Sequence, residues 1–146
     1  MSTVEIRRMR EKDIPATIAI RESITKKKVP KFWQHEIAIR LLESDNQCFV
    51  ATFSKKVVGF IIGETKTLDF GVTKSGWLVD VGIDPNYMGQ GIGKKLGKAM
   101  LRGFNSKGIN RIFTAVRWDS SDLLAFFKSI GFERSEFINL ERRMRK

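Results

Sequence analysis

The sequence predicts an α/β protein, a layered fold with a mixed sheet. Three observations lead to this prediction. Strand-like and helix-like runs alternate in the order β-α-α-β-β-β-α-β-α-β-β. Two apolar runs at 47–53 and 57–64 flank a short turn, which is typical of an antiparallel hairpin. A further apolar run at 77–84 leads through a glycine-rich turn into a long amphipathic helix.

The N-terminal half is expected to supply one strand, two helices and the hairpin. Apolar alternation predicts the strand at 3–9. A helix at 11–24 follows, with Asp13 as its N-cap. The segment TKKKVP at 25–30 separates it from a second helix at about 31–42. The hairpin then completes this half of the chain.

The C-terminal half begins with an expected loop at 68–76, which leads into the short apolar strand at 77–84. An amphipathic helix starts at Ile92 and ends near 105–108, where NSKG interrupts the pattern. The remaining elements are expected to be a strand at 110–116, a helix at 122–130, and a final pair of strands at 132–137 and 138–144.

Length and composition indicate a globular protein. A chain of 146 residues is expected to form one domain, 1–146, around a single core. No apolar run approaches the roughly 20 residues that span a bilayer, and the first residues lack the apolar core of a signal peptide, so a cytoplasmic location is expected. The formal charge of +11 favours an anionic partner, although a solvated basic surface accounts for it as well.

One cysteine and one histidine are compatible by spacing with a catalytic pair, but no flanking signature supports one. The single cysteine, Cys48, excludes an internal disulfide and a cysteine-based zinc cluster, and it is expected to be a small buried side chain. The single histidine, His35, has no flanking catalytic signature. We therefore expect no metal site.

The stretch YMGQGIGKKLGKAML at 87–101 places three glycines and two lysines at the start of a helix. Free backbone N–H groups and the helix dipole make such a turn a binding site for an anion. A P-loop is excluded, because Gly89 and Gly93 enclose three residues instead of four and Lys95 replaces the hydroxyl residue. A Rossmann fingerprint is excluded, because Leu96 stands in place of its third glycine.

The turn GQGIG after a strand that ends in IDP, together with FFKSIGF downstream, resembles the GNAT superfamily of N-acetyltransferases. The resemblance covers essentially the whole chain and is strongest at 78–132. It implies a mixed, mostly antiparallel central sheet flanked by helices. It also implies acetyl-CoA as the co-substrate, with no metal ion.

The resemblance further implies which residues hold acetyl-CoA. Its pyrophosphate would lie against a loop formed by Met88, Gly89, Gln90, Gly91, Ile92 and Gly93. Lys94 follows this loop and would lie near the same anion. The strand residues Val81, Gly82 and Ile83 would lie beside the pantetheine arm and bond to it through their backbone groups. Ser120 stands where the family commonly has an asparagine.

Several positions depart from the family pattern. Met88 stands where the family has a glutamine or arginine and cannot donate a side-chain hydrogen bond. Phe127 stands where a tyrosine commonly protonates the departing thiolate. Ala115 stands where some members carry a glutamate base. The usual acid and one usual base are therefore missing. Either the enzyme works with substitutes, or the fold binds the cofactor and has lost the chemistry. Because a thiol has a pKa of about 8.5, protonation of the leaving thiolate helps the reaction but is not obligatory.

Asp80 is the candidate substitute for the base. It interrupts an otherwise apolar strand, where an unpaired carboxylate costs several kcal/mol. Asp80 either acts on the acceptor, by binding its ammonium or by drawing off its proton through water, or forms a salt bridge with a neighbouring cation, and the sequence leaves both readings open. Glu64 and Asp119 are weaker candidates.

The resulting functional hypothesis is an acetyl-CoA-dependent N-acetyltransferase acting on a primary amine: a protein N-terminus, a lysine or a small molecule. Lysines 26–28 hint at an acidic acceptor, whether a protein tail or an anionic small molecule, although a solvated loop also explains them. The alternative is a catalytically reduced module that binds acyl-CoA or nucleic acid. Nucleic-acid binding is disfavoured, because most aromatic side chains occupy core-like positions.

Overall fold

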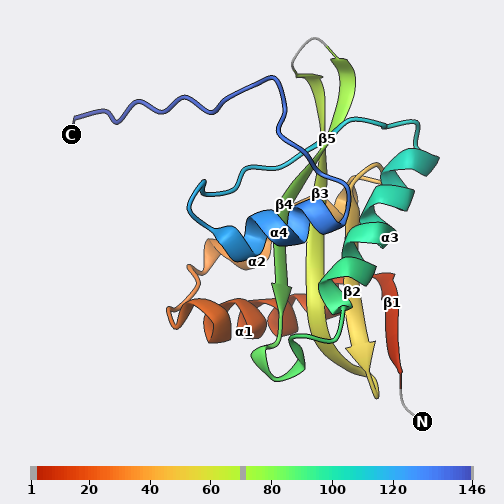
Figure 1. The fold of residues 1–146 in the computed structure, drawn as a ribbon. Coiled ribbons are helices and arrows are strands. Elements are labelled where there is room, and N and C mark those ends of the chain that lie inside the picture. Colours follow the sequence, from red (N-terminus) through yellow and green to blue (C-terminus); the bar gives the residue numbers. More distant parts are fainter. Residues whose placement is uncertain (1–2, 70–71, 146) are drawn as a thin grey trace.

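A computed structural model describes residues 3–69 and 72–145, and the strands in this part form one mixed sheet (Figure 1). The strands lie side by side in chain order. Neighbouring strands from β1 to β4 are antiparallel, and β5 is parallel to β4. The fold class expected from the sequence is thereby confirmed. The strands are β1 (Val4–Arg8), β2 (Gln47–Phe53), β3 (Lys56–Asp69), β4 (Val72–Ile83) and β5 (Ile112–Phe113).

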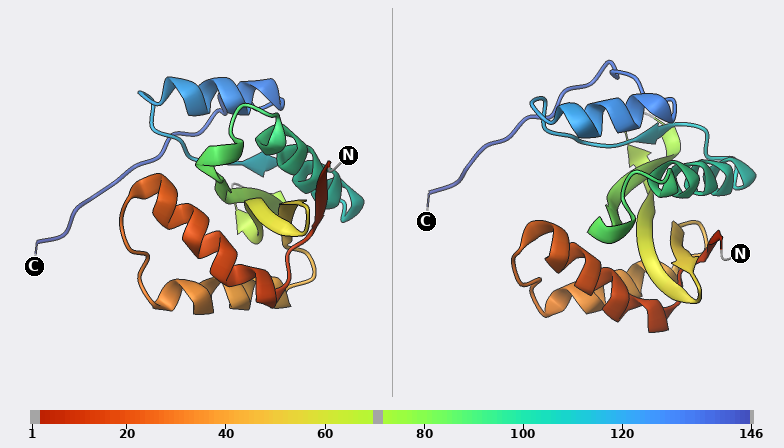
Figure 2. Two further views of the ribbon diagram at one scale, coloured as in Figure 1. Left: turned by 90° about the horizontal axis from the view of Figure 1, so that it is seen from below. Right: turned by 60° about the horizontal axis from the view of Figure 1, so that its bottom comes forward.

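Helices cover both faces of the sheet (Figure 2). The helices are α1 (Ile14–Thr25), α2 (Phe32–Leu42), α3 (Ile92–Ser106) and α4 (Ser121–Ser129), with short 3-10 turns η1 (Glu11–Asp13) and η2 (Pro85–Tyr87). Helices α1 and α2 lie on one face, and α3 and α4 lie on the other. None of the helices in the described residues is long and apolar enough to cross a membrane.

Each face of the sheet has its own apolar core, because successive side chains of a strand point to opposite faces. On the α1 and α2 face, Phe60 and Ile62 of β3 pack with isoleucines of both helices. On the α3 and α4 face, Ile61 of β3 packs among side chains of the two other helices. These helix residues are Ile92, Leu96, Met100 and Phe104 of α3, with Phe127 and Ile130.

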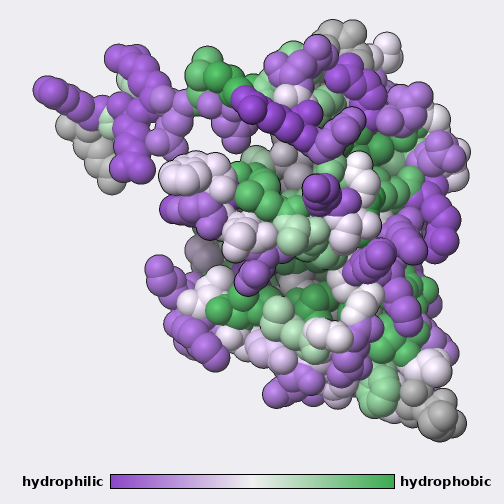
Figure 3. All heavy atoms as spheres, viewed as in Figure 1, coloured by the Kyte–Doolittle hydropathy of each residue, from purple (hydrophilic) through white to green (hydrophobic). Residues whose placement is uncertain are grey.

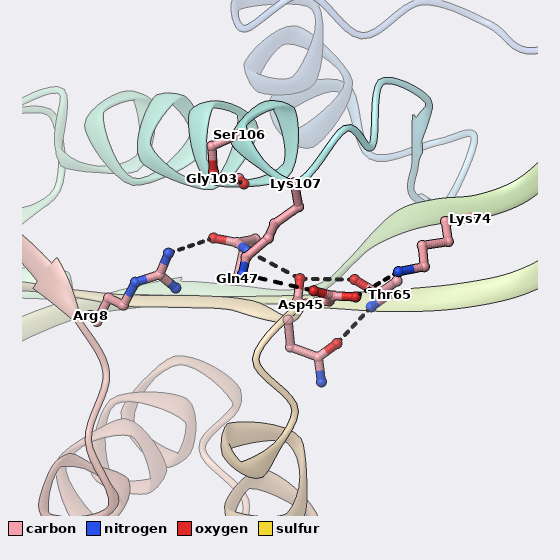
Figure 4. Close-up of polar contacts among 9 residues, drawn as sticks. Arg8, Asp45, Gln47, Thr65, Lys74, Gly103, Ser106 and Lys107 are labelled. Carbon is pink, nitrogen blue, oxygen red and sulfur yellow. Dashed lines mark hydrogen bonds and ion pairs between the residues drawn. The ribbon is translucent and has the colours of Figure 1, made fainter.

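Polar contacts around Gln47 lie between the sheet and the C-terminal end of α3 (Figure 4). The fully buried Gln47 side chain accepts a hydrogen bond from Arg8 Nη2 at 3.1 Å and donates one to the backbone oxygen of Asp45 at 3.1 Å. The Asp45 carboxylate in turn pairs with Lys74 Nζ at 2.9 Å and Lys107 Nζ at 3.9 Å. This cluster holds α3 close to the sheet at a position where the helix carries Gly103.

Gly103→Ala is expected to destabilise the protein, although alanine is the better helix former. A Cβ at this position would lie 1.9 Å from Gln47 Oε1, so α3 or the buried Gln47 must shift. The expected loss of unfolding free energy is about 1–3 kcal/mol, whereas helix propensity alone predicts a gain of about 1 kcal/mol. Arg102→Ala, at an exposed neighbouring position, is the control. Chemical denaturation showing a more stable Gly103→Ala protein would contradict the close approach.

The loop expected at 68–76 is wrong, apart from residues 70–71, which lie outside the described residues. Strand β3 continues to Asp69 and β4 starts at Val72, and their pairing includes Lys66 with Ser75 and Thr67 with Lys74. Backbone hydrogen bonds form this ladder whatever the side chains are. Strand residues that pack against a helix alternate between apolar and polar side chains. This hairpin projects beyond the helices (Figure 1), so its sequence lacks that alternation and resembles a loop.

The strand expected at 110–116 is shorter, and the strand pair expected at 132–137 and 138–144 does not form. Residues 133–137 lie beside β5, where the Phe137 ring is 6.3 Å from that of Phe113 and Glu136 pairs with Arg111 at 3.6 Å. Beyond them the chain extends away from the rest of the fold (Figure 1). Ile138 and Leu140 are 74% and 88% exposed. A strand needs a neighbouring edge along its length, and β5 consists of only two residues. The apolar alternation of this segment is therefore not buried by the fold.

Candidate active site

A cleft opens where β4 and β5 separate. The two strands pair only at Gly76 with Ile112 and at Trp77 with Phe113. One residue further on, Thr114 Oγ1 donates a hydrogen bond of 3.0 Å to the backbone oxygen of Leu78. Beyond this point lies a cleft of about 840 Å³, bounded by α1, β4, the glycine-rich turn and α4. Hydrophobic side chains gather between α4 and α1, with hydrophilic residues around them (Figure 3).

The open edge of β4 presents backbone groups to this cleft. A register shift opposite Ile62 and Gly63 makes Val79 an extra residue in β4. Further along, the Asp84 N–H donates to the Val58 oxygen at 2.8 Å, which fixes the residues of β4 that bond to β3. By the antiparallel pattern, the N–H and C=O groups of Val81 point away from β3. A ligand lying along this edge can therefore bond to Val81 as a further strand would.

The glycine-rich turn forms the second part of the cleft. Gly89 and Gly91 have φ values of +81° and +76°, a region that residues with a side chain rarely adopt. A Cβ on either glycine would meet no atom within 4 Å, so the space in front of both is open. Gly91 is the N-cap of α3. The first backbone N–H groups of a helix have no acceptor within it, which makes this end suited to a phosphate group.

Gly93 has a different role. A Cβ there would lie 3.0 Å from Cε1 of Phe126 on α4. Gly93 therefore allows α4 to pack closely against the first turn of α3, and this packing shapes the cleft wall. Phe127, the next residue of α4, is 7% exposed. Its ring belongs to the core and also lines the cleft, and it lies 5.6 Å from the Phe132 ring.

Asp80 forms an ion pair with Arg21 of α1 inside the cleft. The same guanidinium nitrogen, Nη2, donates to the backbone oxygen of Val81 at 3.1 Å. Arg21 also lies 5.7 Å from the centre of the Phe60 ring, measured from its Cζ atom. Only one carboxylate oxygen of Asp80 is bound by Arg21. The other, Oδ2, is buried and accepts no hydrogen bond from the described part of the chain.

The surroundings of Asp80 make it a stronger base than an ordinary aspartate. Its side chain is 16% exposed, and burial raises the pKa of the carboxyl group because the charged form loses hydration. The positive charge of Arg21, the backbone N–H of Val81 and the hydrogen bond from Arg21 oppose this rise in the pKa without cancelling it. The salt bridge and an oxygen without a hydrogen bond therefore coexist in one carboxylate, so the two readings of Asp80 do not exclude each other.

The structure brings together most of the site residues expected from the sequence. Those that line the cleft are Asp80, Val81, Gly82, Ile83, Met88, Gly89, Gly91, Ile92, Gly93, Lys94 and Phe127. Gln90 and Ser120 are not among the lining residues; Ser120 is the N-cap residue of α4, and its side chain makes no capping hydrogen bond. No group of three or more metal-binding side chains occurs within residues 3–69 and 72–145.

Sequence reasoning missed Arg21, which lies 59 positions before Asp80. A weak signal was present. Arg21 falls between the buried Thr17 and Ile20 on one side and the cleft residue Ile24 on the other, so it continues the inward-facing stripe of α1. An arginine on such a stripe requires a partner, but helical spacing does not identify which one.

In this fold the sheet opens at one strand, and a glycine-rich turn precedes the helix that follows that strand. Residues 8–132 match the model of the Acetyltransferase (GNAT) family. The chain belongs to that family, which confirms the resemblance stated above. Members of this family use acetyl-CoA.

Curated relatives support the same assignment. The chain is 34% identical over 91 residues to a mycothiol acetyltransferase of Amycolatopsis mediterranei, a match that covers 60% of this chain and 30% of the relative. It is 38% identical over 63 residues to the N-alpha-acetyltransferase RimI of Mycobacterium tuberculosis, covering 43% and 36% of the two chains. These matches thus span about a third of each relative.

Solved structures with the same fold are more distant in sequence. An aminoglycoside N-acetyltransferase, AAC(6')-Iy, in complex with a bisubstrate analogue of CoA superimposes with a TM-score of 0.82 at 17% identity, over 98% of this chain and 99% of the other. An aminoglycoside acetyltransferase from a soil metagenomic sample, meta-AAC0020, gives a TM-score of 0.79 at 22% identity, with 97% of each chain covered. At these identities the likeness concerns the fold.

Proposed function

We propose that this protein transfers the acetyl group of acetyl-CoA to a primary amine, with Asp80 as the group that receives the amine's proton. The observation that carries the proposal is the composition of the cleft. It joins an open strand edge and a phosphate-binding turn, where a CoA thioester fits, to a buried carboxylate with one free oxygen. A cytoplasmic location remains a prediction.

The turn and β4 are the parts of the chain that would hold acetyl-CoA. The open space before Gly89 and Gly91 and the exposed start of α3 fit a pyrophosphate, and Lys94 adds a positive charge at the same place. The edge of β4 at Val81 fits the amide groups of a pantetheine arm. Acetyl-CoA supplies an activated acyl group, because a thioester carbonyl is readily attacked by an amine.

Asp80 would act on the acceptor. Attack requires a neutral amine, and the unpartnered Oδ2 would accept its proton, directly or through a water molecule, as the C–N bond forms and the C–S bond breaks. The thiolate then leaves without help from Phe127, which has no proton to give. This is feasible because an ordinary thiol has a pKa of about 8.5, so its anion is a stable leaving group.

The charges around the acceptor end favour an amine that also carries a negative group. Arg21 and Lys26 line that end of the cleft from α1 and the residue after it. The net charge of +11 disfavours a polycation as the acceptor. An acidic peptide or an anionic small molecule with a primary amine is the preferred class, in line with the lysines at 26–28.

An acceptor screen tests the proposed function. Purified protein is incubated with acetyl-CoA and a panel containing acidic and neutral peptides with free α-amines, N-blocked peptides with one lysine, amino sugars and polyamines. Release of free thiol measures turnover, and mass spectrometry identifies the acetylated nitrogen. Turnover above that of the Asp80→Asn protein is expected for an anionic amine. Binding of acetyl-CoA without turnover of any amine would instead favour an acyl-CoA-binding module.

Phe127→Tyr is expected to raise the rate of the chemical step. The new hydroxyl group at the cleft would donate a proton to the leaving thiolate, and general acid catalysis supports a gain of up to about 100-fold at the low end of its range. Single-turnover kinetics measure this step. Phe132→Tyr places a hydroxyl on the neighbouring ring, which does not line the cleft, and serves as the control.

Two other outcomes are distinct. If another group already supplies the proton, the rate stays flat while the melting temperature and the affinity for acetyl-CoA hardly change. If the para position of Phe127 faces the core, the hydroxyl becomes a buried donor without an acceptor, and about 1–3 kcal/mol of stability is lost. That loss without a gain in rate would refute the placement of Phe127 at the thioester.

A further inference from the structure

The guanidinium of Arg21 lies where the two halves of the cleft meet. Its Nη2 atom bonds both to Asp80, on the acceptor side, and to the backbone oxygen of Val81, on the open strand edge. The side chain is 21% exposed and lies over the Phe60 ring, so its position is defined by packing as well as by hydrogen bonds. One side chain thus contacts both functional groups.

The bond to Val81 conflicts with a ligand on the strand edge. A chain that pairs with β4 needs the N–H and C=O groups of Val81, since the neighbouring residues of β4 direct theirs toward β3. In this structure the Val81 oxygen already accepts a hydrogen bond from Arg21. A pantetheine amide would approach this oxygen from the open edge, where the guanidinium already lies, so the two groups would compete for that space even though a carbonyl oxygen can accept two hydrogen bonds.

We propose that Arg21 is a positioning residue that couples the two substrates: it gives up the Val81 oxygen to the pantetheine arm and continues to hold Asp80 for the amine. The proposal rests on the proposed function above. Arg21 would then lower the affinity for acetyl-CoA, because binding must first break its bond to Val81. It would at the same time support transfer to the amine, because it fixes the carboxylate with Oδ2 free.

Other charged groups near the carboxylate are few. From α1, Arg21 contacts Asp80 directly, and Lys26 just beyond α1 lines the same cleft. On β3, the residue opposite Asp80 is the apolar Ile62. From the other walls, Lys94 of α3 and Asp122 of α4 line the cleft. Arg21 is therefore the cation expected to control the ionisation of Asp80.

Arg21→Met provides the first test. Calorimetry with acetyl-CoA is expected to give a dissociation constant about 3- to 10-fold lower than that of the wild type, because one competing hydrogen bond is gone. Arg8→Met is the matched control. Arg8 also donates to a side-chain oxygen, that of Gln47, and lies 5.0 Å from a phenylalanine ring, but it does not line the cleft. The affinity of Arg8→Met for acetyl-CoA therefore shows the effect of losing one positive charge outside the cleft.

Amine turnover provides the second test. Replacing Arg21 is expected to strengthen binding of acetyl-CoA but to impair transfer to the amine. Without the arginine, the pKa of Asp80 rises further, so the acid limb of the pH profile of turnover is expected to move to higher pH. Arg21→Lys keeps a cation beside Asp80, but a single ammonium on a shorter side chain cannot also reach Val81. This variant is expected to keep the acid limb near its wild-type position while binding acetyl-CoA more tightly.

The outcomes separate the two proposals. If the wild-type protein does not bind acetyl-CoA, the proposed function itself is wrong. If the wild type binds it and both Arg21 variants bind no more tightly than Arg8→Met, competition at Val81 is refuted. If Arg21→Met leaves the acid limb unmoved, the control of Asp80 by Arg21 is refuted. Thermal melting of each protein without ligand verifies that the compared variants are folded. If Arg21→Met does not fold, the binding comparison is made with Arg21→Lys.

Discussion

Gly91→Val is expected to abolish binding of acetyl-CoA. The substitution places a branched side chain in the open space before the start of α3, between the backbone amides and any phosphate group. Losing two charge-assisted hydrogen bonds, each worth about 1.5–3 kcal/mol, weakens binding by more than about 100-fold. Calorimetry on the purified protein measures this directly.

Gly108→Val is the matched control for this experiment. Gly108 follows α3 at its other end, has the same φ of +76° and also has no atom within 4 Å of an added Cβ. Valine at either position is strained by a similar amount, about 1–3 kcal/mol, so both variants are expected to melt at lower temperature. Only Gly91→Val should lose acetyl-CoA. Equal affinities of the two variants for acetyl-CoA would show that the glycine-rich turn is not part of the binding site.

Asp80→Asn is expected to reduce amine turnover by about 100- to 10,000-fold, the usual contribution of a general base. Asparagine keeps the shape of the side chain and can still accept a hydrogen bond from Arg21, so binding of acetyl-CoA should change little. Asp45→Asn is the control, because Asp45 is also paired with a cation, Lys74, but lies outside the cleft. Unchanged turnover in Asp80→Asn would leave the ion pair as a structural feature only.

The pH dependence of turnover gives a second measurement on the same variant. A base works only when it is deprotonated, so turnover falls as the pH drops through the pKa of Asp80. Burial raises this pKa, which places the acid limb above the ordinary aspartate value of about 3.9. Asp80→Asn should lose this limb and keep any limb that comes from ionisation of the amine itself. A limb that persists unchanged would assign it to the amine.

The fold class was predictable because local patterns carry it. Helices α1, α2 and α3 were each expected within a few residues of their bounds, since apolar spacing and helix-ending residues are read directly from the chain. The hairpin of β2 and β3 was expected for the same reason. The pairing of Lys66 with Ser75 and of Thr67 with Lys74 was missed, because the side chains of these residues are polar and follow no apolar pattern.

The two strands predicted at the C-terminal end are the opposite case: the sequence predicts them, but the structure does not contain them. Residues 132–144 carry alternating apolar side chains, yet they form no strand: Phe137 contacts Phe113 of β5, and Ile138 and Leu140 beyond it are exposed. Alternation describes what a strand would bury, but it does not supply an edge on which to bury it. Because β5 is two residues long, the edge that the sequence pattern requires is short in the fold.

The sequence by itself determined the family resemblance, the glycine-rich turn and the missing tyrosine at Phe127, because each depends on residues close together in the chain. Only the tertiary structure decided that Arg21 pairs with Asp80, that Gln90 and Ser120 lie outside the cleft lining, and that the sheet opens beyond Thr114. The physical reason is distance along the chain. A turn's conformation is fixed by its own backbone, whereas the environment of a carboxylate depends on elements that packing brings from far away.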